Sequence, residues 1–272
     1  MASEPTPIGD AGAVLEMRRV SRYFGGLAAV KNLDLSVMHG QIHGLIGPNG
    51  AGKTTLFNVI TGANTASSGA VLVDGRDITH LPPHAINHLG VARTFQNIRL
   101  FKEISVYENV RTAATWRGGY GWLHGFIQGL TFERREAAIH DQVLQLLEDF
   151  QLGHRAREVS RSLPYGEQRR LEIVRALATR PKLLLLDEPA AGLNAAETDE
   201  LMALVHRILE QYDLTILLIE HDMRLVMEIC QAITVLDHGE KICEGDADQV
   251  RNDPQVIEAY LGQGDMVDAS DQ

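Results

Sequence analysis

The chain has 272 residues, of which 44% are hydrophobic, and its formal net charge is −11. A chain of this length can bury a substantial core, either as one large domain or as two unequal lobes. The excess of acidic residues argues against non-specific attraction to nucleic acid or to an anionic membrane surface.

Cysteine content and the beginning of the chain exclude further classes. Cys230 and Cys243 are the only cysteines and lack CxxC spacing, which gives neither a disulfide framework nor a structural zinc site and fits a reducing cytoplasm. The first residues lack the basic and apolar stretches of a secretory signal, and no apolar run approaches the roughly 20 residues that span a bilayer. We therefore expect any action at a membrane to depend on other subunits.

Hydrophobic periodicity predicts two sheet regions with a helical insertion between them. Alternation in residues 13–20 and 33–37 predicts an antiparallel edge layer, and residues 41–46 predict a strand that leads through a Gly-rich turn into a helix beginning near Lys53. From about residue 97 to 163 apolar residues recur at helical spacing, as in Ile139, Val143, Leu146, Leu147 and Phe150. The apolar runs 183–186 and 214–219 predict central parallel strands with helices on both faces.

The turn after residue 46 has the composition of a phosphate-binding loop. Its sequence, GPNGAGKTT, comprises Gly47, Pro48, Asn49, Gly50, Ala51, Gly52, Lys53, Thr54 and Thr55. Glycines let backbone N–H groups converge on phosphate oxygens, Lys53 supplies a cation, and Thr54 presents a hydroxyl to Mg²⁺. A chance Gly-rich turn is the alternative, but the strand before the loop and the helix after it favour a nucleotide site.

A second acidic element follows at residues 183–189, LLLLDEP. A buried strand here delivers Asp187 and Glu188 to the edge where parallel sheets bind ligands. Asp187 suits the Mg²⁺ shell, and Glu188 suits polarisation of an attacking water. Taken alone, two acids at a strand end are more often a solvated turn or a helix cap, and only the partnership with Lys53 favours the functional reading.

With LPYGEQRRLEIVRALA at residues 163–178, the chain resembles the ABC (ATP-binding cassette) ATPase family over roughly residues 14–262. The resemblance implies an α/β P-loop NTPase fold with a mixed sheet core, an antiparallel β edge layer and an inserted helical subdomain. It also implies that Tyr165, Gly166 and Glu167, in the signature segment (residues 163–178), approach the ATP held by an opposite subunit. ATP and Mg²⁺ are the implied cofactors.

Single positions match the family pattern as well. The resemblance places Phe24, in RYFGG, against adenine, Gln96, in RTFQN, near Mg²⁺ and the attacking water, and His221, in LLIEHD, at the γ-phosphate. Each residue alone is more often core, surface or structural. The implied catalytic set is Glu188, His221, Gln96 and Lys53, and the implied metal set is Thr54, Gln96 and Asp187.

Two positions depart from the pattern. Pro164 stands where the signature commonly has serine, which removes a hydroxyl and a backbone N–H. Asn194, in AGLN, stands where many members carry aspartate, which weakens charge-based coupling between two sites.

Further stretches narrow the resemblance to one branch. Residues 92–110, LDEPAAGLN, LLIEHDM and the ending DPQVIEAYLG resemble the larger ATPase subunit of bacterial high-affinity branched-chain amino acid importers. Relatives that serve urea, amides or other small solutes are the first alternative, a soluble non-transport ABC protein the second, and a P-loop kinase or GTPase the third. The implied partners are a second ATPase subunit, either a related shorter chain or a second copy, transmembrane permease subunits, and indirectly a periplasmic solute-binding protein, with no nucleic acid.

The expected organisation follows from these assignments. We predict flexible segments at 1–12 and 263–272 around an ATPase domain at 13–262. Within that domain, residues 13–96 and 164–262 form the core with its β edge layer, and 97–163 form the helical subdomain, with the signature helix following from 164. The expected location is the cytoplasmic face of the bacterial inner membrane.

Overall fold

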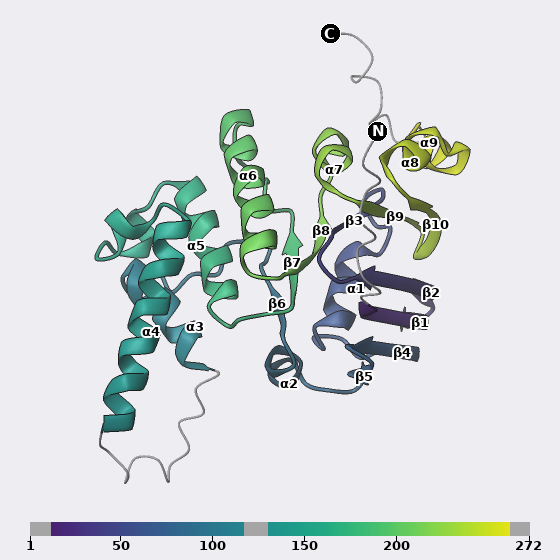
Figure 1. Ribbon diagram of the computed structural model, residues 1–272. Helices are drawn as coiled ribbons and strands as arrows, with labels where there is room; N and C mark the ends of the chain where they lie inside the picture. Colours follow the sequence, from purple (N-terminus) through teal and green to yellow (C-terminus); the bar gives the residue numbers. More distant parts are fainter. Residues whose placement is uncertain (1–11, 117–129, 262–272) are drawn as a thin grey trace, which may run out of the picture.

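Two β-sheets and the helices around them form the protein in this computed structural model, which describes residues 12–116 and 130–261 (Figure 1). The predicted flexible ends fall outside the described residues, apart from Gly12. No helix in these two ranges is both long and apolar enough to cross a membrane.

The smaller sheet is antiparallel and has the strand order β2-β1-β4-β5. Its strands are β1 (Ala13–Phe24), β2 (Leu27–Met38), β4 (Ser68–Val73) and β5 (Arg76–Asp77). Asp74 and Gly75 join β4 to β5 with positive φ at both positions, 48° and 73°, as a tight two-residue hairpin turn requires. The predicted antiparallel layer is confirmed.

The larger sheet is mixed and has the strand order β10-β9-β3-β8-β7-β6. Its strands are β3 (Ile42–Ile46), β6 (Val91–Arg93), β7 (Leu183–Asp187), β8 (Thr215–Ile219), β9 (Ala232–Asp237) and β10 (Glu240–Gly245). Neighbours run parallel except for β10, which is antiparallel to β9. The carboxyl ends of β3, β8 and β7 therefore lie side by side, and the residues that follow these strands meet at one edge.

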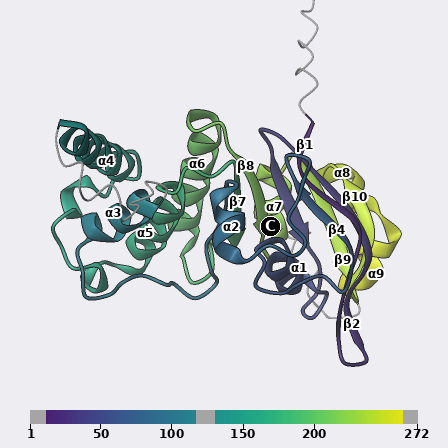
Figure 2. The same cartoon turned by 90° about the horizontal axis from the view of Figure 1, so that it is seen from below.

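Helices connect the strands and form one end of the molecule. They are α1 (Lys53–Ile60), α2 (Pro83–His88), α3 (Val106–Trp116), α4 (Leu130–Asp149), α5 (Tyr165–Leu177), α6 (Ala195–Gln211), α7 (Met223–Ile229), α8 (Ala247–Asn252) and α9 (Pro254–Leu261), with short 3₁₀ turns η2 (Gly153–Arg155) and η3 (Ser160–Ser162). Figure 2 shows α3, α4 and α5 together at one end and the antiparallel strands with α8 and α9 at the other. The five residues that suggested helical spacing before 163 are all buried.

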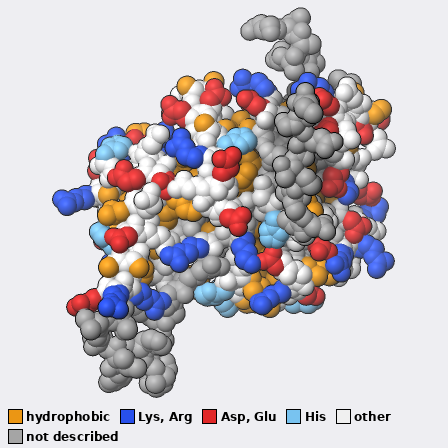
Figure 3. Space-filling model, in the orientation of Figure 1, with side chains coloured by type: hydrophobic (Ala, Val, Ile, Leu, Met, Phe, Trp, Pro, Cys, Tyr) orange, Lys and Arg blue, Asp and Glu red, His pale blue; other side chains and the backbone are white. Residues whose placement is uncertain are grey.

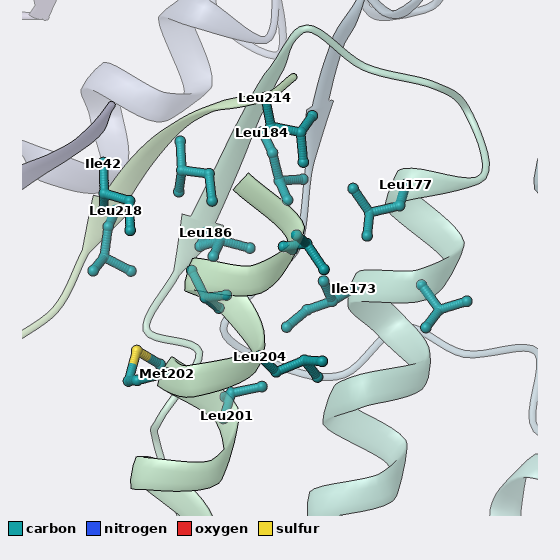
Figure 4. Packing of buried hydrophobic residues seen from close by; sticks show 14 of the residues in the cluster. Ile42, Ile173, Leu177, Leu184, Leu186, Leu201, Met202, Leu204, Leu214 and Leu218 are labelled. Carbon is teal, nitrogen blue, oxygen red and sulfur yellow. The ribbon is translucent and has the colours of Figure 1, made fainter. Parts of the chain in front are cut away.

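The central sheet separates two hydrophobic cores. Along β7, Leu184 and Leu186 face one core, whereas Leu183 and Leu185 face the other, because successive side chains of a strand point to opposite faces. In the first core Leu184 and Leu186 pack among residues of α5 and α6, such as Ile173 and Leu204 (Figure 4).

The second core confirms a helix on this face and adds another element. This face of the central sheet packs against α1 together with the four-stranded sheet, as shown by Phe57 of α1 and Leu15 of β1 in the same cluster. The antiparallel sheet has one apolar face and must bury it against another layer. It therefore shares this face of the central sheet with α1. On the outside, acidic and basic side chains are interspersed over the face shown in Figure 3.

Candidate nucleotide site

The phosphate loop, residues 47–55, depends on glycines at two positions of close backbone approach. Gly47 has φ 146° and Gly52 has φ 104°, and a Cβ at these positions would lie 2.0 Å from the Leu236 carbonyl oxygen and 2.3 Å from that of Ala29. Only glycine fits both the conformation and the space. Gly52 is also the N-cap of α1, so the first N–H groups of that helix face the loop.

Lys53 lies inside this loop, and both predicted acids interact with it. Its Nζ donates hydrogen bonds to the carbonyl oxygens of Gly47 at 2.5 Å and Pro48 at 3.0 Å. Burial lowers the pKa of the Lys53 ammonium, and the nearby charges of Glu188 and Asp187 oppose that shift. One strand, β8, separates β3 from β7, which places the two strand ends about 10 Å apart. The structure thus brings the lysine and the two acids together.

Asp187 is buried and has a partner that we did not predict. Arg93 on β6 donates from Nη2 to Asp187 Oδ2 at 2.6 Å, and the two side chains are only 7% and 6% exposed. Arg93 also donates to Asn58 Oδ1 of α1 at 2.7 Å, and its guanidinium lies 5.3 Å and 5.1 Å from the ring centroids of Phe57 and Phe95. The sequence signal was a lone arginine in a short strand beside a strand that ends in an acid.

Glu188 adopts a strained backbone conformation next to Gln96. Its φ is 49°, in the left-handed region that non-glycine residues rarely occupy. Gln96 Nε2 donates to Glu188 Oε2 at 2.6 Å, so these two predicted residues are in direct contact. Strained residues of this kind concentrate at functional sites, where the surrounding structure holds them.

His221 lies after β8 at the same edge as Glu188 and is largely exposed, and its neighbour Glu220 is buried. Glu220 accepts hydrogen bonds from the backbone N–H groups of Ala190 at 2.8 Å and His221 at 3.3 Å. Burial raises the pKa of the Glu220 carboxyl, and these hydrogen bonds oppose that shift. Glu220 joins the segment after Glu188 to the segment that carries His221, a link that the sequence did not reveal.

Phe24, at the end of β1, is 44% exposed. The guanidinium of Arg22 lies 4.5 Å from the ring centroid, and Arg22 Nη1 also donates to the Thr65 carbonyl oxygen at 2.9 Å. An exposed aromatic face held from one side suits stacking with a planar base.

The signature segment lies apart from the phosphate loop of the same chain. Tyr165, Gly166 and Glu167 form the first turn of α5, and Figures 1 and 2 both place α5 and α1 on opposite sides of β7. Pro164 is the N-cap of α5 and donates no side-chain or backbone hydrogen bond. One chain does not bring both parts to one phosphate.

Asn194, the other departure, is the N-cap of α6. Its side chain accepts from the Glu197 N–H at 3.0 Å, and the Glu197 carboxylate accepts from the Asn194 N–H at 3.0 Å. Asparagine is thus a full member of a capping box at this position.

The oxygen donors at the site fit a hard cation that is bound together with a nucleotide. The described residues contain no cluster of three or more His, Cys, Asp or Glu side chains that could hold a metal ion alone. Mg²⁺ in nucleotide sites takes only one or two protein ligands and completes its shell with phosphate and water. Within the described ranges Asp187 Oδ1 accepts no hydrogen bond, and the Thr54 side chain is exposed.

Comparisons with known proteins agree with this geometry. A family model described as "ABC transporter" matches residues 30–191, and one described as "Branched-chain amino acid ATP-binding cassette transporter" matches residues 240–265. Over 250 residues the chain is 44% identical to the high-affinity branched-chain amino acid transport ATP-binding protein BraF of Pseudomonas aeruginosa and 43% identical to LivG of Escherichia coli. Each of these two matches covers 92% of this chain and 98% of the relative.

A solved structure agrees as well. The ADP conformation of MJ1267, an ATP-binding cassette of an ABC transporter, superposes with a TM-score of 0.79 at 31% identity and covers 92% of this chain and 99% of that one. Because the larger family match includes both the phosphate loop and the strand that carries Asp187 and Glu188, the chain belongs to the ABC transporter family as an ATP-binding ATPase subunit.

Proposed function

We propose that this ATPase powers the import of branched-chain amino acids through a bacterial ABC transporter. The observation that carries the proposal is the meeting of Lys53, Asp187 and Glu188 at one edge of the central sheet. The solute class rests on BraF and LivG, which are named for branched-chain amino acid transport, and on the short C-terminal family match.

The proposed roles follow from the geometry of each side chain. Lys53 leaves its carbonyl partners in the phosphate loop to bind the β- and γ-phosphates, and Phe24 stacks on adenine. Thr54, Gln96 and Asp187 hold Mg²⁺, which neutralises charge on the phosphates when it is bound. Gln96, Glu188 and His221 then orient the attacking water and the γ-phosphate.

A second ATPase subunit completes the site in this proposal. Because α5 lies away from α1 within one chain, Tyr165, Gly166 and Glu167 act on the nucleotide of a neighbouring subunit. With Pro164 at the N-cap, the backbone N–H groups of Tyr165 and Gly166 supply the phosphate contacts. The partner is a related shorter ATPase or a second copy of this chain, bound beneath transmembrane permease subunits that receive solute from a periplasmic binding protein.

The division at residues 97–163 has a function in this scheme. We assign 13–96 and 164–262 to the nucleotide-binding core and 97–163 to a helical subdomain, and we place the subunit at the cytoplasmic face of the inner membrane. Gln96 lies at the junction of the two parts, where movement on nucleotide binding reaches the permease subunits.

Solute uptake tests the proposal directly. In a strain that lacks this chain, uptake of labelled leucine, isoleucine and valine is expected to fall and to return with the wild-type gene. Uptake of urea and of short amides, measured in parallel, is expected to stay unchanged. A loss confined to urea or amides would assign the other solute class, and no loss of any uptake, together with failure to copurify with hydrophobic membrane subunits, would reject the transporter role.

Glu188→Gln tests the hydrolytic site itself. The variant keeps an oxygen for Gln96 but loses the charge that polarises water, so we expect ATP binding to remain and turnover to fall at least about 100-fold. Glu210→Gln changes an exposed acid on α6 and serves as the matched control. Full turnover in Glu188→Gln would remove Glu188 from the mechanism.

A further inference from the structure

A fully buried arginine in α5, the helix of the signature segment, donates hydrogen bonds to the segment that contains Gln96. Arg169 is 0% exposed, and it donates from Nη1 to the Phe95 carbonyl oxygen at 2.8 Å and from Nη2 to the Gln96 carbonyl oxygen at 2.9 Å. Glu172, 2% exposed, pairs with Arg169 at 3.3 Å and accepts from the Arg99 N–H at 3.1 Å. Hydrogen bonds of a buried charged group to carbonyl oxygens are among the stronger ones in proteins. The position of Gln96 is therefore tied to α5.

Tyr165 extends this hydrogen-bond network to the segment that follows Glu188. The tyrosine hydroxyl accepts from Arg169 Nη2 at 3.3 Å and donates to the Ala191 carbonyl oxygen at 3.1 Å. The ring packs against Gly192, where an added Cβ would lie 3.1 Å from the Tyr165 Cε1 atom. The hydroxyl donates its one proton to one partner and accepts a proton from the other through a lone pair, so it bridges the two.

Two more hydrogen bonds close these contacts into a ring around Glu188. Gln96 Nε2 donates to Glu188 Oε2 at 2.6 Å, and the Ala191 N–H donates to the Glu188 carbonyl oxygen at 3.2 Å. The ring runs from Glu188 through Gln96, Arg169, Tyr165 and Ala191 and returns to Glu188. It holds both the side chain and the backbone of a residue whose φ of 49° needs support from its surroundings.

We propose that Tyr165 and Arg169 are positioning residues that hold the Glu188 carboxylate of their own chain in the geometry for hydrolysis. This inference rests on the proposed function, in which the same signature segment contacts nucleotide on the neighbouring subunit. One chain then links two ATP sites. A neighbouring subunit's nucleotide that contacts Tyr165 changes the hydrogen bonds that position Glu188 of the chain to which Tyr165 belongs. Tyr165 is 45% exposed, which leaves the residue open to a second subunit while its hydroxyl stays in the ring of hydrogen bonds.

Tyr165→Phe isolates the bridge because it keeps the ring against Gly192 and removes only the hydroxyl. Amide hydrogen exchange of the isolated, nucleotide-free chain is the first measurement. Loss of one such hydrogen bond is expected to raise exchange about fivefold in residues 95–99 and 188–192 together. Tyr107→Phe is the matched control, since it removes a hydroxyl bonded to His140 Nδ1 at 2.8 Å in the helical region and should leave both segments unchanged.

Steady-state ATPase measurements on the assembled transporter are the second readout. We expect Tyr165→Phe to lower kcat about fivefold and to leave KM for ATP unchanged. Arg169→Lys, which keeps the charge but lacks the planar fork, is expected to raise exchange in the same two segments. Unchanged exchange in 188–192 in both variants would overturn the proposal even if kcat falls, because the hydroxyl would then act only across the subunit interface. Amide exchange is measured on the nucleotide-free chain and does not depend on ATPase activity. An inactive wild-type complex would therefore reject the proposed function, and the exchange result would still test this inference.

Discussion

Replacing Arg93 by methionine removes the cation that faces Asp187 while keeping much of the side chain's packing volume. Both members of the pair are more than nine-tenths buried, so little solvent is available to replace the lost charge. Breaking a buried pair by removal of one partner costs about 3–5 kcal/mol. The loss of the hydrogen bond to Asn58 and of the ring contacts with Phe57 and Phe95 falls within the same range. We expect the free energy of unfolding to drop by about 4 kcal/mol.

Urea unfolding followed by far-UV circular dichroism measures this loss. With a denaturant slope of about 3 kcal/mol per molar, a 4 kcal/mol loss lowers the midpoint by about 1.3 M. Arg93→Lys restores the charge but cannot reach Asn58 and Asp187 with one planar fork, so its midpoint is expected to lie between those of methionine and the wild type. A shift below about 0.3 M for Arg93→Met would show that the pair contributes little and would refute the reasoning.

The other predictions concern pH and helix capping. Burial lowers the pKa of His43 from 6.5 to about 4. As the pH falls, His43 is therefore protonated in the unfolded chain before it is protonated in the folded one. The free energy of unfolding then decreases between about pH 6.5 and pH 4, by about 3 kcal/mol in total. His43→Gln removes that titration, so the gap in unfolding free energy between wild type and variant should narrow between pH 7 and pH 4.5; a constant gap would contradict the buried neutral imidazole. Asn194→Ala removes the cap of α6 and should cost about 1 kcal/mol in urea unfolding, whereas Asn194→Asp should change little; equal losses for both would deny the capping role.

The sequence predicted those parts of the site that depend on short stretches of chain. The phosphate loop needs glycine where φ is positive and the backbone lies close to Leu236 and Ala29, and such needs leave a recognisable spacing. Asp187 and Glu188 were placed correctly at a sheet edge because four apolar residues before them predict a buried strand.

Contacts between distant segments were not predicted. Arg93 meets Asp187 because β6 pairs with β7 in a register that sets Arg93 beside Leu185, and nothing local to either segment specifies that register. The hydrogen bonds from Arg169 to the carbonyl oxygens of residues 95 and 96 likewise depend on how α5 packs beside β6. The packing of the four-stranded sheet beside α1 on one face of the central sheet has the same origin, since alternation in residues 13–20 predicted a sheet but not the layer against which it packs.

The outer strands of both sheets bear on how the subunit behaves before assembly. An unpaired strand edge is a template for stacking of identical chains into insoluble aggregates. Here β5 and β6 are two and three residues long, β10 carries Glu240, Lys241 and Glu244, and Lys31 of β2 forms an ion pair with Glu240. Short or charged outer strands discourage such stacking, so a newly made subunit can remain dispersed at high concentration until its partners are available.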